Sequence, residues 1–337
     1  MKILENISLK RYNTFGIDAS AKYFLEANSV SDIQSFLDDK IISKHPILIL
    51  GGGSNILFTG DFEGVVIKNN IKGIELIRED EHHVYLKAGA GESWHGMVMH
   101  CIGRNYAGVE NLALIPGSVG ASPIQNIGAY GVEQKDVFYE LEAIDLHGNN
   151  KVVFSNSDCK FGYRDSIFKR KAKNKFIIIS VTYCLNKKPT YHTSYGAINQ
   201  ELERMGVKEL SIAAVSQAVC NIRKSKLPDP AVTGNAGSFF KNPTVTKERF
   251  EQLKKEFPSI VGYPSETSCK LAAGWLIEQC GWKGTSFGSF GVHKDQALVL
   301  VNYGGAIGSE LVELSEKIMQ SVLEKFDVAL EREVVII

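Results

Sequence analysis

The sequence predicts an α+β fold in which short strands and helices alternate without a regular repeat. Many short apolar segments are separated by turn residues, which is typical of strands joined by tight connections. Longer segments place their apolar residues on one helical face. The even rhythm of long strand–helix–strand units does not occur. With 337 residues, of which 44% are hydrophobic, the chain is long enough for two or three domains.

Strands are expected where short apolar runs lie between turns. The C-terminal run is rich in β-branched residues and is expected to return to a sheet. In chain order the expected strands are Ala21–Glu26, Pro46–Leu50, Ile56–Phe58, Gly64–Lys68, Ile74–Ile77, His83–Ala88, Glu140–Leu146, Asn150–Phe154, Phe176–Leu185, Ala297–Asn302 and Val328–Ile337.

Helices are expected where apolar residues recur on one face. The segment Ser211–Arg223 shows this pattern and is stopped by Pro228-Asp229-Pro230, where a domain boundary is expected. The other expected helices are Val30–Asp39, Glu92–Arg104, Lys247–Phe257, Cys269–Cys280 and Ser309–Phe326.

Composition and charge exclude several classes of function. Lys+Arg and Asp+Glu both number 38 and the sequence pI is about 7.1, which argues against nucleic acid or an anionic membrane as the main partner. The N-terminus does not resemble a secretory signal, and no apolar run approaches a membrane span. The six cysteines are far apart and indicate free thiols in a reducing cytoplasm. The histidines show no metal-ligand spacing, so no metal is expected.

The segment from Gly108 to Gly131, GVENLALIPGSVGASPIQNIGAYG, is the most unusual part of the chain. It contains five glycines, two prolines and one charged residue, Glu110, so it is neither a regular helix nor a central strand. Its many apolar residues indicate a buried loop. Such a loop can approach a phosphate-bearing cofactor closely, or it can be a set of tight turns between strands. Composition alone leaves both interpretations open.

Another glycine-rich loop, Gly51-Gly52-Gly53-Ser54-Asn55, follows an expected strand directly. In chain order it is called the first loop, and the segment from Gly108 to Gly131 is called the second or central loop. Backbone N–H groups at the end of a strand suit a pyrophosphate, although a simple turn is an equal alternative for this loop alone. It is not the dinucleotide fingerprint, because Ile56 stands where the last glycine belongs, and it is not a P-loop. Two such loops in one chain favour a cofactor held between them.

Three polar residues lie in apolar surroundings and are candidates for chemistry. Arg164 can pair with a carboxylate or stabilise developing negative charge, or it can be a surface residue paired with Asp165. Ser238 lies in a tight turn, where it can be a turn residue, a phosphate contact or a proton donor. Glu333 lies in the apolar terminal strand, where a carboxylate indicates either a sheet edge or a functional site. No G-x-S-x-G motif occurs, which argues against a serine hydrolase.

Together these motifs resemble the UDP-N-acetylenolpyruvoylglucosamine reductase (MurB) family of flavoenzymes. The resemblance spans nearly the whole chain in family order. The matching runs are NTFG (13–16), LILGGGSNILF (48–58), NLALIPGSVGASPIQNIGAYGVE (111–133), FGYRDSIFK (161–169), KLPDP (226–230), GNAGSFFKNP (234–243), AAGWLIEQC (272–280) and LEREV (330–334).

The resemblance implies an FAD-binding domain in two parts, of the vanillyl-alcohol-oxidase (PCMH) type, and a smaller α+β substrate domain. The implied division is residues 1–70 with the terminal strand 327–337, residues 71–224, and residues 225–326. NADPH is the implied reductant and a nucleotide sugar the implied substrate. The implied FAD-binding residues are Gly51, Gly52, Gly53, Ser54, Asn55, Pro116, Gly117, Ser118, Gly120, Ser122, Gln125, Gly128 and Ala129.

The resemblance also assigns catalytic and substrate-binding roles. Arg164 and Glu333 would polarise the substrate carboxylate, and Ser238 would donate a proton to the α-carbon. Tyr195 matches the loop tyrosine of the longer family branch, although Ser194 here separates it from Thr193. The implied substrate contacts are Tyr130, Tyr195, Arg223, Lys226, Asn242 and Gln296, with Lys226 and Arg223 as charge partners of the diphosphate.

The expected protein is therefore a cytoplasmic, monomeric, NADPH-dependent flavoprotein oxidoreductase of peptidoglycan precursor synthesis. One alternative is a sugar oxidase of the same fold that uses oxygen, which should lack Ser238 and Glu333. A second is a nucleotide-sugar binding protein without turnover, although all three catalytic positions are present.

Overall fold

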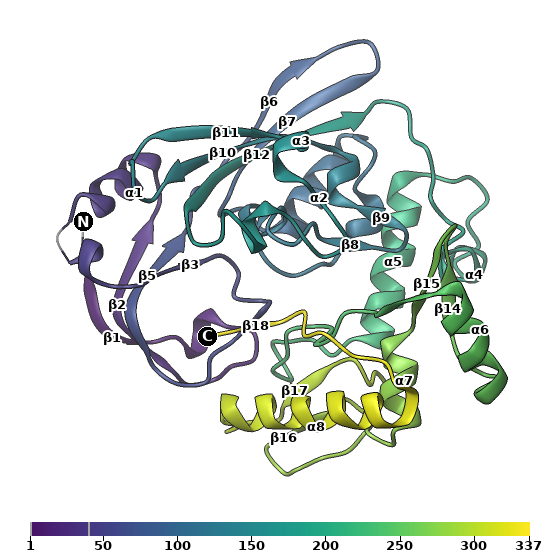
Figure 1. Ribbon diagram of the computed structural model, residues 1–337. Coiled ribbons are helices and arrows are strands. Elements are labelled where there is room, and N and C mark those ends of the chain that lie inside the picture. The colour runs from purple at the N-terminus through teal and green to yellow at the C-terminus, as the bar shows by residue number, and fades with distance from the viewer. Residues whose placement is uncertain (1, 40) are drawn as a thin grey trace. The chain divides into compact units, whose positions relative to one another are not determined.

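The computed structural model describes residues 2–39 and 41–337. Their backbone divides into two compact units (Figure 1). Unit 1 comprises the described residues of Met1–Ile7, Ala21–Gly53 and Glu63–Ser225, and unit 2 comprises Ser8–Ser20, Ser54–Phe62 and Lys226–Ile337.

Most of a four-stranded sheet, with the order β1-β2-β5-β3, belongs to unit 1. Its strands are β1 (Leu4–Ser8), β2 (Ser20–Ala27), β3 (Ile47–Leu50) and β5 (Phe62–Asn69). Strands β3 and β5 run parallel, with Leu50 opposite Lys68. Helix α1 (Val30–Leu37) begins at a capping box and buries Ile33 and Phe36 in a cluster with this sheet.

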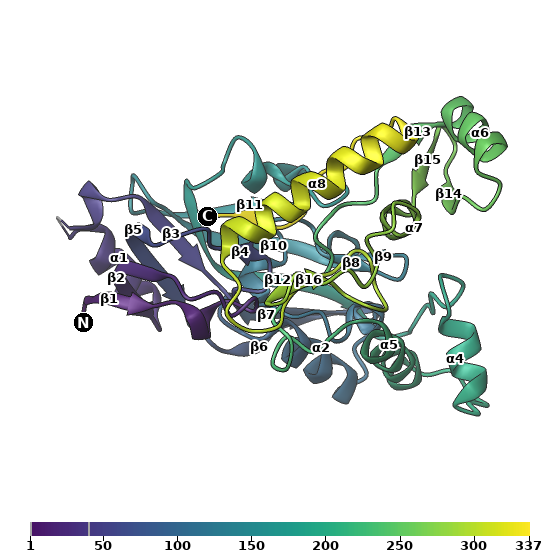
Figure 2. The ribbon, with the colours of Figure 1, turned by 90° about the horizontal axis from the view of Figure 1, so that it is seen from below.

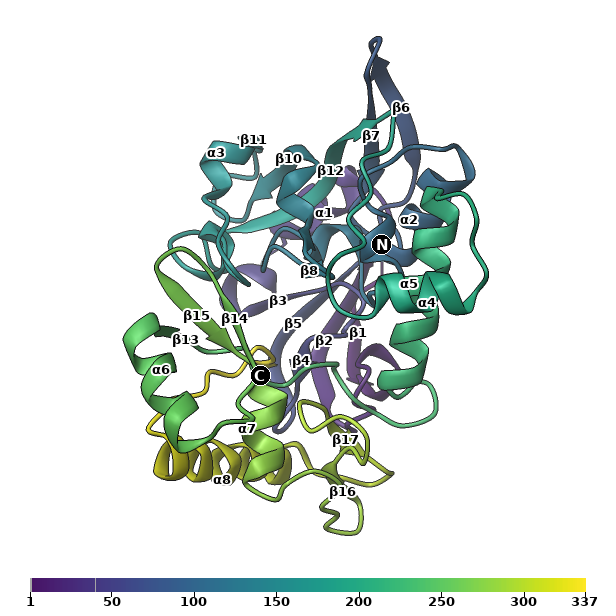
Figure 3. The same ribbon diagram turned by 90° about the vertical axis from the view of Figure 1, so that its right-hand side faces the viewer.

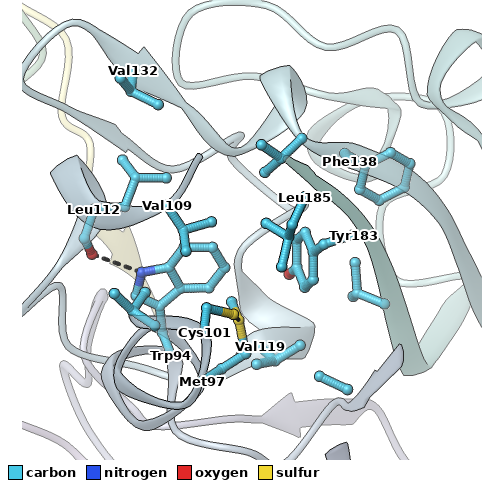
Figure 4. Packing of buried hydrophobic residues seen from close by; sticks show 14 of the residues in the cluster. Trp94, Met97, Cys101, Val109, Leu112, Val119, Val132, Phe138, Tyr183 and Leu185 are labelled. Atoms are coloured by element: carbon cyan, nitrogen blue, oxygen red, sulfur yellow. Dashed lines mark hydrogen bonds between the residues drawn. The ribbon is translucent and has the colours of Figure 1, made fainter. Parts of the chain in front are cut away.

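A five-stranded antiparallel sheet, with the order β11-β10-β12-β7-β6, forms the larger part of unit 1. Its strands are β6 (Ile74–Glu79), β7 (His83–Gly89), β10 (Phe138–Asp145), β11 (Lys151–Ser155) and β12 (Phe176–Asn186). Helix α2 (Trp94–Gly103) buries Trp94, Met97 and Cys101 in the core beside it. The Trp94 indole N–H donates to the Leu112 carbonyl at 2.8 Å, which ties the helix to the central loop (Figure 4).

The remaining strands and α-helices of unit 1 are short except for helix α5. They are β8 (Gly128–Ala129), β9 (Val132–Glu133), α3 (Asn156–Cys159), α4 (Ile198–Arg204) and α5 (Ile212–Lys226). The last residue of α5, Lys226, belongs to unit 2. Strands β8 and β9 pair as a small antiparallel hairpin at the end of the glycine-rich segment, with β9 directly after Gly131. Helix α5 buries Val215, Val219 and Ile222, as its apolar spacing predicts, and the last two lie in the main core of unit 1.

Unit 2 combines small sheets with three helices. The strands are β4 (Ile56–Leu57), β13 (Thr244–Thr246), β14 (Gly262–Pro264), β15 (Ser268–Leu271), β16 (Phe290–Val292), β17 (Leu300–Asn302) and β18 (Val335–Ile336). The helices are α6 (Lys247–Glu256), α7 (Ala273–Gln279) and α8 (Gly308–Phe326). Helix α6 lies beside the three-stranded sheet β13-β15-β14 (Figure 3). Helix α8 is the longest in unit 2 (Figure 2). It buries Leu311, Leu314, Ile318 and Val322.

Three expected elements differ from the structure. The expected strand Ala297–Asn302 pairs only as β17, Leu300–Asn302, because Ala297 and Leu298 lie in a turn closed by the Val299 N–H, which donates to the Gln296 carbonyl at 3.0 Å. The expected helix Cys269–Cys280 is a strand, β15, followed by the shorter helix α7. Cys269 and Leu271 are buried and alternate with half-buried neighbours in β15, and pairing on both sides with β13 and β14 outweighs helical periodicity there. The expected strand Val328–Ile337 pairs as a strand only at Val335–Ile336, parallel to β4.

Among the described residues, no helix is both long enough and apolar enough to cross a membrane.

Candidate functional site

The two glycine-rich loops lie directly against each other in unit 1. A Cβ atom added at Gly52 would lie 2.7 Å from the Cα of Gly117, and one added at Gly51 would collide with the Ser118 hydroxyl. Real Cβ atoms essentially never approach another atom below 3.0 Å. The contact therefore requires glycine on the first loop, and it builds a continuous backbone surface from both loops.

Backbone hydrogen bonds fasten the second loop to the start of α2 and the end of β7. The Trp94 N–H donates to the Gly117 carbonyl at 3.0 Å, and the Gly120 N–H donates to the Ala90 carbonyl at 2.9 Å. The buried Ser122 hydroxyl donates to the Val119 carbonyl at 2.8 Å and contacts the Tyr183 hydroxyl at 3.0 Å. The Ser122 side chain thus has a structural role within the loop.

A lysine that the sequence did not single out lies beside the first loop. The Lys68 ammonium donates to the Gly51 carbonyl. Burial, followed by the charge of Lys72, lowers the pKa of Lys68, while Glu26 opposes the change. A half-buried cation at a loop suited to pyrophosphate adds positive charge where a phosphate ligand would need it. The parallel pairing of β3 with β5 places this lysine next to the loop, and sequence reasoning did not specify that pairing.

Several residues of the candidate site have a left-handed backbone, which is costly for residues other than glycine. They are Leu114 (φ 58°), Asn126 (φ 48°), Tyr130 (φ 51°) and Arg164 (φ 52°). Each such residue costs on the order of 1–3 kcal/mol, and such strain concentrates at functional sites. Of these four residues of the candidate site, Tyr130 and Arg164 have proposed roles. Asn126 is bonded to the turn of Arg164, and Leu114 accepts a hydrogen bond from Arg223. Other residues with a left-handed backbone lie elsewhere in the chain.

Arg164 occupies a tight turn that is fastened to the central loop. Gly162 and Asp165 exchange both backbone hydrogen bonds across this turn. The Asn126 amide donates to the Gly162 carbonyl at 3.0 Å, and the buried Ser166 hydroxyl donates to the Ile124 carbonyl at 2.7 Å. These bonds fix the turn that carries the guanidinium.

The Arg164 guanidinium itself points back to the central loop. Its Nη2 donates to the Gly128 carbonyl at 2.7 Å, and its carbon lies 5.3 Å from the centre of the Tyr163 ring. Asp165, the alternative partner considered for Arg164, instead pairs with Arg170 at 3.1 Å. The structure thus brings Arg164 together with Gly128, a residue of the expected FAD site.

Three of the expected substrate contacts lie close together in unit 1. The Tyr195 side chain lies against Gly131, because a Cβ atom added at Gly131 would lie 3.3 Å from the Cβ of Tyr195. Burial lowers the pKa of Arg223, and the neighbouring charge of Arg164 lowers it further, while Tyr130 opposes the change. Burial raises the pKa of Tyr130, and the charge of Arg223 counteracts it. The guanidinium groups of Arg164 and Arg223 are close enough to repel each other, so their surroundings favour a bound anion.

In unit 2, backbone pairing brings Ser238 close to Glu333. The Phe239 N–H donates to the Leu298 carbonyl at 2.7 Å, and the Phe239 carbonyl accepts from the Glu333 N–H at 2.8 Å. The terminal segment therefore runs alongside the segment that carries Ser238. The Asn55 amide also donates to the Glu333 carbonyl at 3.2 Å, so an expected FAD residue supports an expected catalytic one.

The turn before Ser238 depends on Asn235. This buried amide donates to the carbonyls of Pro228 and Thr233, at 3.2 and 2.8 Å, and its oxygen accepts from the Gly237 N–H at 2.9 Å. Gly237 has φ 69°, which a residue with a side chain adopts at a cost. This asparagine belongs to the GNAGSFFKNP run, but no local pattern indicates its role in the turn.

The other expected substrate contacts of unit 2 lie in different settings. The Asn242 side-chain oxygen accepts from the Ala273 N–H at 3.0 Å and so caps the start of α7. The Gln296 side-chain oxygen accepts from the Leu298 N–H at 3.4 Å. Lys226 is exposed at the end of α5. Their substrate contacts remain predictions.

The rest of the expected FAD residues lie on the two loops. Gly53 is buried, Ser54 and Asn55 are half-buried, and Asn55 also accepts from the Val335 N–H at 3.0 Å. The remaining three are Pro116, Gln125 and Ala129, of which Gln125 and Ala129 are half-buried. No cluster of three or more His, Cys, Asp or Glu that could hold a metal ion occurs in the part of the chain that the structure describes.

Known proteins match this chain over its full length. The family model described as "FAD binding domain" matches residues 21–153, and the one described as "UDP-N-acetylenolpyruvoylglucosamine reductase, C-terminal domain" matches residues 229–337. The UDP-N-acetylenolpyruvoylglucosamine reductases of Flavobacterium johnsoniae and Amoebophilus asiaticus are 49% and 50% identical to it, with 100% of each chain covered. The chain belongs to the UDP-N-acetylenolpyruvoylglucosamine reductase family. The resemblance seen in the motifs is confirmed.

A solved reductase of this family shows the same fold. The UDP-N-acetylenolpyruvylglucosamine reductase (MurB) of Thermus caldophilus matches with a TM-score of 0.66 and 23% identity, covering 100% of this chain and 99% of that one. With the FAD-binding match, this confirms the predicted α+β fold with an FAD-binding domain.

Proposed function

We propose that the protein reduces UDP-N-acetylglucosamine enolpyruvate to UDP-N-acetylmuramate with FAD and NADPH, in the synthesis of peptidoglycan precursors. Full-length likeness to relatives named UDP-N-acetylenolpyruvoylglucosamine reductase carries this proposal. The strained, fastened turn of Arg164 and the backbone pairing beside Ser238 and Glu333 support it.

The residues of unit 1 fit a flavin dinucleotide. The direct contact of Gly52 with Gly117 leaves a backbone surface without side chains, where a diphosphate can approach N–H groups closely. The ammonium of Lys68 adds positive charge beside it. When bound, FAD supplies the redox chemistry, taking a hydride from NADPH and giving one to the enolpyruvyl β-carbon.

The chain's own residues handle charge and a proton. Arg164 and Glu333 polarise the substrate carboxylate and stabilise the enolic negative charge that forms when a hydride reaches the β-carbon. Ser238 donates its hydroxyl proton to the α-carbon, which completes the addition of one hydride and one proton across the double bond. Tyr130, Tyr195, Arg223, Lys226, Asn242 and Gln296 bind the nucleotide sugar.

The three-part organisation belongs to the same proposal. FAD is bound by residues 1–70 with the terminal strand 327–337 and by residues 71–224, and residues 225–326 bind the substrate. The protein acts as a monomer in the cytoplasm, without nucleic acid or a membrane as partner.

Changing Ser238 to alanine separates the two half-reactions. We expect the Ser238→Ala enzyme to be reduced by NADPH at the wild-type rate, and to reduce the enolpyruvyl substrate at least about 100-fold more slowly, since a general acid contributes about that much or more. Stopped-flow absorbance of the flavin measures both rates. Ser259→Ala, an exposed serine of the same unit, is the control and should match wild type.

Each other outcome points to a different conclusion. Equal loss in both half-reactions would remove Ser238 as the proton donor. If the reduced flavin of the wild-type protein is reoxidised only by oxygen, the sugar oxidase is favoured. If the wild-type protein binds the nucleotide sugar without turnover, the nucleotide-sugar binding protein is favoured.

A further inference from the structure

His95, in the first turn of α2, makes a hydrogen bond to the central loop, and it is not among the expected site residues. Its ring nitrogen Nδ1 lies 3.0 Å from the backbone nitrogen of Leu114. A backbone N–H can only donate, so Nδ1 is the acceptor, and in the neutral ring the hydrogen is on Nε2. The contact therefore exists only while His95 is uncharged.

Leu114 needs such an anchor because its backbone is strained. Its φ of 58° lies in the left-handed region, where a residue with a branched side chain is disfavoured. The same residue is held from the other side, since the Arg223 Nε donates to the Leu114 carbonyl at 3.3 Å. One strained residue thus links His95 on α2 to Arg223 on α5.

Arg223 is a proposed contact of the substrate diphosphate, and its position depends on that link. Within unit 1 its guanidinium lies close enough to Tyr130 and Arg164 for each to affect its pKa. We infer that His95 is a positioning residue for nucleotide-sugar binding, which fixes Arg223 through the strained backbone of Leu114. This inference rests on the proposed function.

The surroundings of His95 keep the imidazole neutral near pH 7. Burial lowers its pKa, and the charges of Lys224 and Arg223, both on α5, lower it further. A cation is also unfavourable in the first turn of a helix. Below its pKa, the added proton on Nδ1 faces the Leu114 N–H, and two donors repel each other. Substrate binding is then weakened in acid.

Three variants test the positioning role by enzyme kinetics. In His95→Phe the acceptor is lost, and we expect KM for the enolpyruvyl nucleotide sugar to rise about five- to tenfold, the factor that one hydrogen bond confers, with kcat within about twofold. In His95→Asn the amide oxygen can replace Nδ1, so KM at pH 7 should stay near wild type and should lack the rise that protonation of His95 causes in the wild type as the pH falls below the ordinary imidazole value of 6.5. His100→Phe, on the same helix, is the control and should match wild type.

Hydrogen exchange of the protein without substrate tests the same contact independently of any activity. We expect faster amide exchange in a peptide spanning residues 109–116 for His95→Phe, and wild-type protection for His95→Asn and His100→Phe. Unchanged exchange and unchanged KM in His95→Phe overturn the inference. Altered exchange with unchanged KM shows that His95 holds the loop without positioning Arg223, and also overturns it. If the wild-type protein shows no turnover, the proposed function is contradicted rather than the role of His95. The hydrogen-exchange result alone then decides whether His95 holds Leu114.

Discussion

Gly52→Ala is the most direct perturbation of the contact between the two glycine-rich loops. The φ of Gly52 lies outside the left-handed region, so alanine causes no backbone strain and its effect is steric alone. The new Cβ would lie 2.7 Å from the Cα and 3.1 Å from the carbonyl carbon of Gly117. Both are backbone atoms, so a loop must move. Overpacking of this kind costs about 1–3 kcal/mol.

We expect that cost to appear mainly as weaker FAD binding. If binding requires the loops in their present positions, about 1–3 kcal/mol corresponds to a Kd roughly 5- to 150-fold higher. Titration of flavin-free protein with FAD, followed by flavin fluorescence, measures Kd, and thermal unfolding without FAD reports any general damage. Gly103→Ala is the matched control, because a Cβ there meets nothing within 4 Å. A wild-type Kd for Gly52→Ala would refute the claim that this contact shapes the FAD site.

Three further predictions concern charged residues. Lys68→Met removes the donor to the Gly51 carbonyl and should weaken FAD binding about fivefold, given about 1 kcal/mol per hydrogen bond; an unchanged Kd contradicts this. Lys226→Ala should raise KM for the nucleotide sugar with kcat nearly unchanged, and unchanged KM removes its diphosphate role. Burial works against ionisation of Glu142, but bonds to two lysines and a serine hold its pKa at about 2. Because this lies below the ordinary value of 4.5, its stabilising effect is complete above about pH 4.5 and is lost as the pH falls toward 2. Glu142→Gln should therefore be less stable than wild type at pH 7, by about 1 kcal/mol after solvent screening, and equally stable near pH 2 in urea unfolding; an equal difference at both pH values contradicts it.

Local composition predicted the glycine-rich loops but not their partners. The density of glycine and proline, with a single charge, identified residues 108–131 as a buried loop, and the structure places its Gly117 against Gly52 of the other loop. The family motifs predicted the α+β fold with its FAD-binding domain, which the comparisons confirm. The expected roles of individual residues remain predictions.

Contacts between residues far apart in the sequence could not be predicted from local patterns. Lys68 reaches the first loop only because β5 pairs in parallel with β3, a choice of register that no local pattern specifies. His95 contacts Leu114 because α2 lies against the loop, and its position on a helix gave no sign of this. The expected helix Cys269–Cys280 wrongly includes residues 269–271 of strand β15, since an apolar run of this length fits either structure until its partners are known.

The proposed function requires that one protein uses NADPH to reduce its flavin and then the enolpyruvyl substrate to oxidise it again. An anaerobic visible spectrum of the FAD-loaded protein follows both steps. We expect the flavin band to bleach with NADPH and to return when UDP-N-acetylglucosamine enolpyruvate is added without oxygen. A band that bleaches but returns only with oxygen, or a protein that binds no FAD, would contradict it.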